Sequence, residues 1–191
     1  MKKLESTWYN MSIVLTVISV VAGAALAYVN DITTAPIREI KEKQLQEGIR
    51  SVLSAKELII ESVDTTGNVI IYSTDKGKAV QASDPNGFGG KLTVLVGFDE
   101  DGFILGYRVL ESAETPGLGA KAAEWFQKGA KGDIIGKSPK RDNMTVSKDG
   151  GDVDAITAST ITSRAFLRCV NAAYGALAEC DAESGATKQK N

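Results

Sequence analysis

The sequence predicts an α+β protein in which a single N-terminal transmembrane helix precedes an antiparallel sheet with flanking helices. Three observations lead to this prediction. Residues 11–29 form an uncharged apolar run, short strand-like runs separated by turn residues lie between 58 and 110, and helical apolar patterns flank those runs. Neighbouring short strands joined by tight turns pair antiparallel, so helices grouped around them give the α+β class.

The apolar run 11–29 has the length of a membrane span. Nineteen residues at about 1.5 Å each reach about 28 Å, close to a hydrocarbon core of about 30 Å. The alternative is a cleaved signal peptide, because Lys2 and Lys3 precede the run and Ala25–Ala27 resembles a cleavage site. The run exceeds the usual signal h-region of about 7–15 residues, which favours a retained anchor after a short N-terminus, residues 1–10.

The remaining elements follow from apolar periodicity and turn residues. Thr-Thr-Ala-Pro at 33–36 predicts a helix start, with proline in the first turn, so that residues 30–56 form a linker helix before a domain at 57–180. The glycine spacing of the turn 85–90 is neither a Walker A motif nor a dinucleotide fingerprint, which favours a flexible turn before the strand at 91 over a nucleotide loop. The other expected elements are strands at 58–62, 69–73, 91–98 and 103–110, turns at 64–68 and 99–102, helices at 120–128 and 160–178, a strand near 144–147 and a mobile polar tail at 181–191.

Composition excludes several kinds of chemistry. The chain has no histidine, which excludes a Ser-His-Asp centre and His-ligated zinc, and its two cysteines cannot hold a four-thiolate iron–sulfur cluster. Cys169 and Cys180 lie about 16 Å apart along a continuous helix, too far to form a disulfide. A net charge of −2 argues against a nucleic-acid partner. Redox chemistry in this chain therefore calls for an organic cofactor.

Hydroxyl residues are concentrated directly ahead of the last predicted helix. Five of the seven residues from Thr157 to Ser163 are Thr or Ser. Such hydroxyls cap free N–H groups at a helix start, and the same helix end attracts anions such as phosphate. The residues alone leave both an ordinary capped helix and a phosphate site open.

The segment 154–160 resembles the Asp-x-x-Ser/Thr-Gly-Ala-Thr signature of a family that carries FMN as a threonyl phosphoester. The family comprises the G subunit of the Rnf electron-transport complex and the C subunit of the Na+-translocating NADH:quinone oxidoreductase. The closing threonine of that signature is the attachment point and matches Thr160, whereas Ala158 and Ser159 replace the usual Gly and Ala. The resemblance implies a cofactor site formed by Asp154, Thr157, Ala158, Ser159, Thr160 and Thr162.

A second motif, Glu-Thr-Pro-Gly-Leu-Gly at 114–119, follows the strand-like run 102–110. Taken alone it is a Pro/Gly turn. It resembles the other hallmark of the same family, in the same order along the chain, although Ser112 stands where the family often has His. We expect this turn to contact the flavin ring, because glycine permits close backbone approach. The residues implied are Glu114, Thr115, Gly117, Leu118 and Gly119.

The resemblance implies a membrane-anchored flavoprotein electron carrier, one component of an ion-translocating ferredoxin:NAD+ oxidoreductase that is not catalytic alone. A threonine hydroxyl needs an activating base, and we expect a separate flavin transferase to attach FMN from FAD. The implied partners are the other membrane subunits of the complex. The lysines flanking the anchor give no clear orientation, whereas the family places the N-terminus in the cytoplasm and the flavin domain outside the bacterial inner membrane.

Two alternatives remain open from the sequence. The C subunit of the Na+-translocating quinone reductase shares the threonine motif, but it is typically longer between anchor and flavin domain. A flavin-free, membrane-tethered binding or scaffold module is compatible with the replacements at Ala158 and Ser159.

Overall fold

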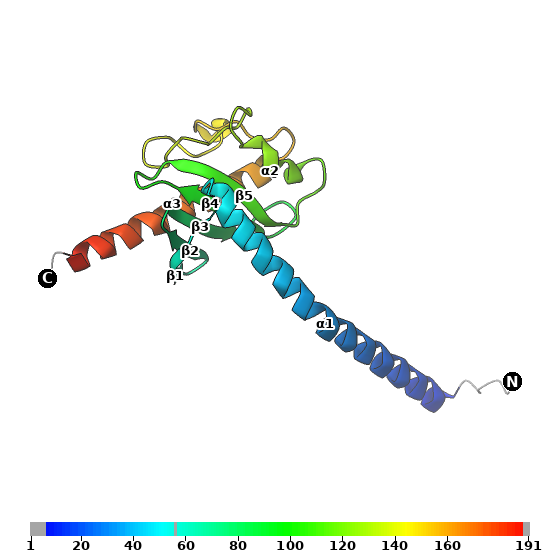
Figure 1. Cartoon of the computed structure of the whole chain (residues 1–191). Helices are drawn as coiled ribbons and strands as arrows, with labels where there is room; N and C mark the ends of the chain where they lie inside the picture. Colours follow the sequence, from blue (N-terminus) through cyan, green and yellow to red (C-terminus); the bar gives the residue numbers. More distant parts are fainter. Residues whose placement is uncertain (1–6, 56, 189–191) are drawn as a thin grey trace. The chain divides into compact units, whose positions relative to one another are not determined.

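The structure, a computed structural model, describes residues 7–55 and 57–188. It divides into two compact units, one ending at Gln44 and one beginning at Leu45. The elements labelled in Figure 1 are α1 (Trp8–Val52), β1 (Ile60–Thr66), β2 (Val69–Thr74), β3 (Gly77–Asp84), β4 (Leu92–Phe98), β5 (Ile104–Ser112), the 3-10 turn η1 (Gly119–Lys121), α2 (Ala122–Trp125), the 3-10 turn η2 (Ser147–Asp149) and α3 (Thr160–Lys188).

Helix α1 is continuous and includes Pro36, so the predicted helix start at 33–36 is wrong. Proline removes one helical hydrogen bond, at a cost of about 3 kcal/mol in a helix interior. Here the surrounding helix is exposed, so the carbonyl that loses its partner remains accessible. The Thr34 hydroxyl also donates to the Asn30 carbonyl at 2.6 Å, which adds a bond beside the gap. The boundary between the two compact units falls inside the predicted linker segment 30–56.

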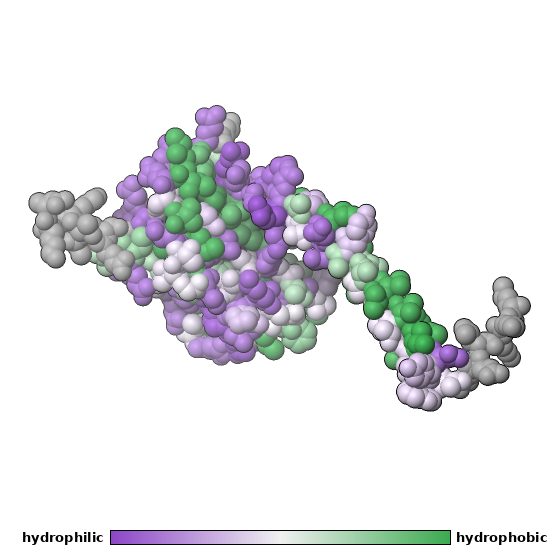
Figure 2. Space-filling model, turned by 90° about the horizontal axis from the view of Figure 1, so that it is seen from below, coloured by the Kyte–Doolittle hydropathy of each residue, from purple (hydrophilic) through white to green (hydrophobic). Residues whose placement is uncertain are grey.

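The N-terminal part of α1 has the properties expected of a membrane span. Among the residues described, α1 is the one helix long and apolar enough to cross a membrane, and it contains the whole of 11–29. Hydrophobic residues follow one another along this part of the helix (Figure 2). Their side chains are exposed, as the lipid-facing surface of an anchor requires.

The five strands form one antiparallel sheet in the order β1-β2-β3-β4-β5, so each strand pairs with the next along the chain. The predicted turn 99–102 is confirmed, because the Asp99 side chain accepts the Phe103 N–H at 2.8 Å between β4 and β5. The predicted limits 58–62 and 64–68 are wrong. Strand β1 extends to Thr66, and a two-residue turn follows that starts at Gly67, whose positive φ suits such a turn.

Strand β3 has no counterpart among the predicted strands. Its side chains do not alternate between apolar and polar, because both of its faces are covered. Ala79 belongs to the core on one face of the sheet, and its neighbour Val80 belongs to the core on the other. A strand buried on both faces lacks the period of two that reveals a half-buried strand.

Two helices cover the two faces of the sheet. Helix α3 packs on one face in the larger core, where Phe166 stacks on Phe126 with ring centres 4.2 Å apart. The last turns of α1, from Leu45 onward, pack on the other face in a smaller core with Ile49 and Val52 at its centre. The second compact unit is therefore a three-layer arrangement of helix, sheet and helix.

Paired glycines make room for the end of α1. Gly97 and Gly106 are cross-strand partners on β4 and β5. A Cβ on Gly97 would lie 2.6 Å from the Val52 carbonyl oxygen, and one on Gly106 would lie 3.1 Å from it. Because no side chain fits at Gly97 without displacement, these glycines form a notch that receives the last turn of α1.

The segment after β5 is attached to the sheet through Tyr107. Its hydroxyl donates to the Ala122 carbonyl at 2.7 Å and accepts the Phe126 N–H at 3.2 Å. Burial raises the pKa of Tyr107, so the hydroxyl keeps its proton. The predicted helix 120–128 is shorter than expected, since only the single turns η1 and α2 form.

Two further limits differ from prediction. The predicted strand 144–147 is only a bridge between Val146 and Val153. Helix α3 continues to Lys188, so its predicted end near Ala178 is wrong and the predicted tail begins inside the helix. The apolar residues at helical spacing, on which the predicted end rests, stop before residue 181. No proline follows there to end the helix, so the helix continues.

The two cysteines do not pair, as predicted. Both are free, and the Cys169 side chain is buried in the larger core. Burial raises the pKa of the Cys169 thiol to about 12. The thiol is therefore neutral at physiological pH and acts as a small apolar group.

The glycine notch can be tested with two matched substitutions. Gly97→Ala is expected to lower the free energy of unfolding by about 1–3 kcal/mol, because its methyl group collides with the α1 backbone. Gly175→Ala, with nothing within 4 Å, is expected to raise it by about 0.5–1 kcal/mol through helix propensity. Urea titrations compare the two, and equal stability of Gly97→Ala and wild type would contradict the notch.

Candidate functional site

A pocket of about 280 Å³ lies where the 114–119 turn meets the start of α3. It contains members of both sequence motifs, which are distant along the chain. The lining residues are Phe88, Glu114, Thr115, Leu118, Gly119, Ala158, Ser159, Thr160 and Ile161. The fold therefore brings most of the predicted site residues into one cavity.

Four predicted site residues do not line this pocket: Asp154, Thr157, Gly117 and Thr162. Asp154 accepts the Ser147 hydroxyl at 3.2 Å and so holds the η2 turn. Gly117 has a φ of +80°, which its turn requires. Thr162 is buried beneath the pocket, and Thr157 is exposed outside it.

The Glu114 carboxylate is buried between two turns of the backbone, 85–90 and 114–119. Only 7% of Glu114 is exposed, and its Oε2 accepts the Gly89 N–H at 3.3 Å. A Cβ on Gly119 would lie 2.5 Å from Oε2, and one on Gly87 would lie 2.6 Å from Oε1. The glycine at 119 is therefore needed for close approach to Glu114. The buried Oε1 has no hydrogen-bond partner in the described part of the chain.

The hydroxyls at the start of α3 differ in whether they donate a hydrogen bond to another group. Ser159 donates to Thr162 Oγ1 at 2.8 Å, and both side chains are buried. Ser163 donates to the Ser159 carbonyl and accepts the Ile156 N–H. Thr160 is half-buried, lines the pocket, and its hydroxyl donates to no group among the described residues. Of the hydroxyls from Thr157 to Ser163, Thr160 alone lines the pocket without donating a hydrogen bond to a described residue.

Ala158 occupies a backbone conformation that favours glycine. Its φ is +62°, in the left-handed region. An L-residue with a Cβ pays about 1–2 kcal/mol there. This conformation explains why the FMN-attachment signature usually has Gly at this position. Ala158, which replaces that Gly, is strained.

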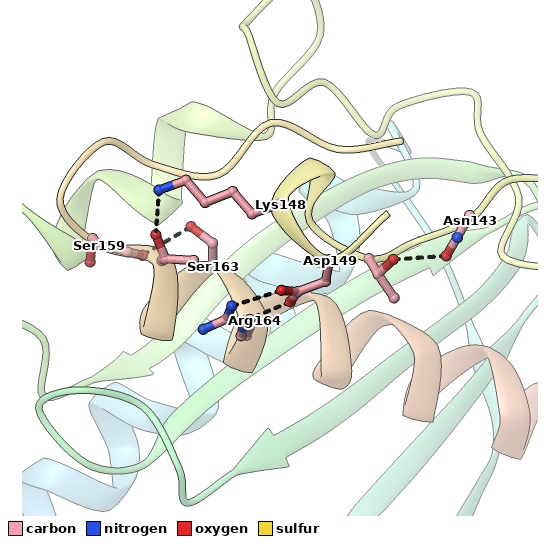
Figure 3. A network of polar contacts seen from close by, with 8 residues as sticks. Asn143, Lys148, Asp149, Ser159, Ser163 and Arg164 are labelled. Carbon is pink, nitrogen blue, oxygen red and sulfur yellow. Dashed lines mark hydrogen bonds and ion pairs between the residues drawn. The ribbon is translucent and has the colours of Figure 1, made fainter. Parts of the chain in front are cut away.

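Cations surround the first turns of α3. Lys148 on η2 extends toward α3, and its Nζ lies 3.5 Å from Thr160 Oγ1 (Figure 3). Arg164 faces Asp149 and donates two hydrogen bonds to its carboxylate, at 2.7 and 2.8 Å. These hydrogen bonds hold the pKa of Asp149 below its ordinary value.

The sequence motifs do not include three residues that the structure places at the site: Phe88, Lys148 and Ile161. Phe88 lies in the turn 85–90, which therefore does more than connect two strands. A large apolar residue among glycines was the available signal. The sequence signal for Ile161 is weaker: it is an exposed apolar residue, outside the face of α3 that packs on the core. Lys148 had none, since its position depends on tertiary contacts.

The family model for the FMN-binding domain matches residues 87–175, which include the residues that line the pocket. The G subunit of the Na+-translocating ferredoxin:NAD+ oxidoreductase complex of Acetobacterium woodii is 32% identical over 89% of this chain and 93% of the relative. The G subunit of the ion-translocating oxidoreductase complex of Aliivibrio fischeri is 29% identical over 88% of this chain and 89% of the relative. The corresponding G subunit of Yersinia pestis is 38% identical over 52% of this chain and 51% of the relative. The chain belongs to the G-subunit family of ion-translocating, Rnf-type oxidoreductase complexes.

The strain at Ala158 leads to a stability prediction. Ala158→Gly relieves the left-handed strain and adds only about 0.4–1 kcal/mol of unfolded-state entropy, so it should stabilise the protein by about 0.5–1 kcal/mol. Ala155→Gly, at an ordinary φ in the same loop, should destabilise it by a similar amount. Thermal unfolding distinguishes them, and a lower midpoint for Ala158→Gly would refute the strain.

Proposed function

We propose that this chain is a membrane-anchored flavoprotein electron carrier of an ion-translocating ferredoxin:NAD+ oxidoreductase complex, with FMN bound to Thr160 through a phosphoester. One observation carries the attachment site. Thr160 is the signature hydroxyl that lines the pocket and donates to no acceptor among the described residues, whereas Ser159, Thr162 and Ser163 are buried and hydrogen-bonded to one another or to backbone.

The residues of the pocket fit the parts of FMN. Phe88, Leu118 and Ile161 are 68%, 43% and 48% exposed and give the pocket apolar walls, which suit a planar aromatic ring. Glu114 lines the same pocket, and its Oε1, which has no partner among the described residues, would suit an N–H donor such as the one on the flavin ring. The start of α3 suits the phosphate, because a helix N-terminus favours anions.

The bound flavin would supply transfer of one or two electrons, and the chain supplies position and electrostatics. In this account the phosphoester fixes the tail of the cofactor at Thr160. Leu118 and Ile161 would limit the access of water to a ring held in this pocket, and Glu114 would contribute a buried carboxylate to its surroundings. The electron donor and acceptor belong to other subunits.

Attachment requires a second protein in this proposal. The chain has no histidine to activate Thr160. A flavin transferase would use FAD, so that the Thr160 oxygen bonds to the FMN phosphorus as the FAD anhydride breaks. AMP then leaves and takes up the hydroxyl proton.

The match in length favours the G subunit over the longer C subunit of the quinone reductase, because the alignment covers 93% of the Acetobacterium woodii relative. We infer a single-pass topology in the bacterial inner membrane, with α1 as a retained anchor and the FMN-binding domain on the periplasmic side. The apolar run within α1 supports the anchor.

Topology can be tested with reporter fusions. Alkaline phosphatase fused after Asn191 should be active, because it folds only outside the cytoplasm, and a green fluorescent protein fusion should be dark. Protein extracted from membranes should retain Met1 or Lys2 at its N-terminus. An N-terminus near Tyr28 would identify a cleaved signal peptide, and an inactive phosphatase fusion would reverse the orientation.

The attachment site leads to a mass prediction. The full chain co-produced with a flavin transferase should gain the mass of one FMN less water, and Thr160→Ala should remove this gain because it removes the acceptor oxygen. Thr157→Ala and Thr162→Ala are the matched controls and should retain it. Intact-mass spectrometry reads all four proteins.

Each contrary mass result has a distinct meaning. Loss of the gain only in Thr162→Ala would mean that another hydroxyl carries the flavin. Absence of flavin from the wild-type chain would support the flavin-free scaffold.

A further inference from the structure

We propose that Lys148 is a positioning residue whose ammonium group pairs with the phosphoester at Thr160, an inference that rests on the proposed function. Its Nζ lies 3.5 Å from Thr160 Oγ1, the atom that would carry the phosphorus. A cation at this distance from the bridging oxygen is within reach of the non-bridging oxygens on the same phosphorus. The contact lies beside the pocket that Thr160 lines together with Glu114, whose buried Oε1 has no hydrogen-bond partner among the described residues.

The charges around α3 favour Lys148 over its neighbours. Arg164 is engaged by Asp149 in a two-point ion pair. Arg168 is engaged by the carboxylate of Asp84. Lys148 makes no ion pair with any carboxylate in the described ranges 7–55 and 57–188. It is therefore the cation at this helix start whose charge is not already neutralised.

The charge of one lysine also matches the charge of the proposed phosphoester. A phosphate esterified to both Thr160 and the ribityl chain keeps one negative charge at neutral pH. One ammonium group neutralises it, and the partial positive charge of the helix start adds to the attraction. A second free cation is not needed, which is consistent with Arg164 being occupied by Asp149.

The η2 turn holds Lys148 in place. Asp149, the next residue, is bound to Arg164 on α3, and Ser147, the preceding residue, donates to Asp154 at 3.2 Å. Gly150 ends the turn with a φ of +86°. The residues on both sides of Lys148 are thus held by hydrogen bonds, and the Lys148 side chain extends toward the start of α3 (Figure 3). Asp154 of the signature acts here through η2 and not through the pocket.

The test uses the full chain in detergent, prepared with and without FMN by co-production with or without a flavin transferase. The variants are Lys148→Met, Lys148→Arg and, as a matched control, Lys140→Met, which removes an exposed lysine from another loop. Two quantities are measured: the 31P resonance of the phosphoester, and the rise in melting temperature that FMN causes.

Lys148→Met should shift the 31P resonance and reduce the FMN-dependent rise in melting temperature by about 2–4 °C, because an ion pair in the FMN form is lost. Lys148→Arg should restore most of both, and Lys140→Met should change neither. A merely structural role for Lys148 would lower the melting temperature equally with and without FMN. Loss of FMN uptake in Lys148→Met but not in Lys148→Arg would also support the pair.

Failure of this inference is distinguishable from failure of the proposed function. If wild type carries FMN at Thr160 and Lys148→Met leaves the 31P resonance and the temperature rise unchanged, Lys148 does not pair with the phosphoester. If wild type carries no FMN at Thr160, both proposals fail.

Discussion

The buried Glu114 carboxylate is the constraint on which the arrangement of the site depends. It accepts the Gly89 N–H, and the absence of side chains at Gly87 and Gly119 lets two loops close on it. An unpaired buried carboxylate oxygen is costly, and Oε1 has no hydrogen-bond partner in the described part of the chain, which supports our proposal of a ligand that supplies a donor. Glu114 thereby joins the turn 85–90, which carries Phe88, to the turn that carries Leu118.

Helix α3 connects this site to the core. Its buried face, with Phe166 at the centre, packs on the sheet, and its first turn presents Thr160 to the pocket. Two arginines on its exposed face extend the same framework. Arg164 fixes η2, and Arg168 fixes the end of β3 through Asp84, just before the turn that carries Phe88. Burial of one helix face thus positions the Thr160 hydroxyl, the Lys148 ammonium group and the Phe88 wall of the pocket, to which we assign attachment, counter-charge and ring packing.

Patterns within short stretches of the sequence predict the elements whose structure depends mainly on neighbouring residues. The apolar run 11–29, the 99–102 hairpin and the start of α3 at the hydroxyl cluster are of this kind. No period of two predicts strand β3, because both of its faces are buried, and Pro36 does not start a helix, because an exposed helix tolerates the lost hydrogen bond. Both motifs of the site were recognised, but Lys148 and Phe88 reach it through contacts between distant segments. No period or spacing in the sequence encodes such contacts.

The central claim is that the pocket between the two motifs holds the ring of a flavin tethered at Thr160. Fluorescence anisotropy of the flavin tests this most directly, since a ring packed in the pocket rotates with the protein and a ring on a free tether does not. The account predicts high anisotropy in the native protein, a fall on denaturation, and a partial fall in Leu118→Ala, which removes one exposed wall without disturbing the core. Low anisotropy in the native, fully flavinylated protein would contradict it.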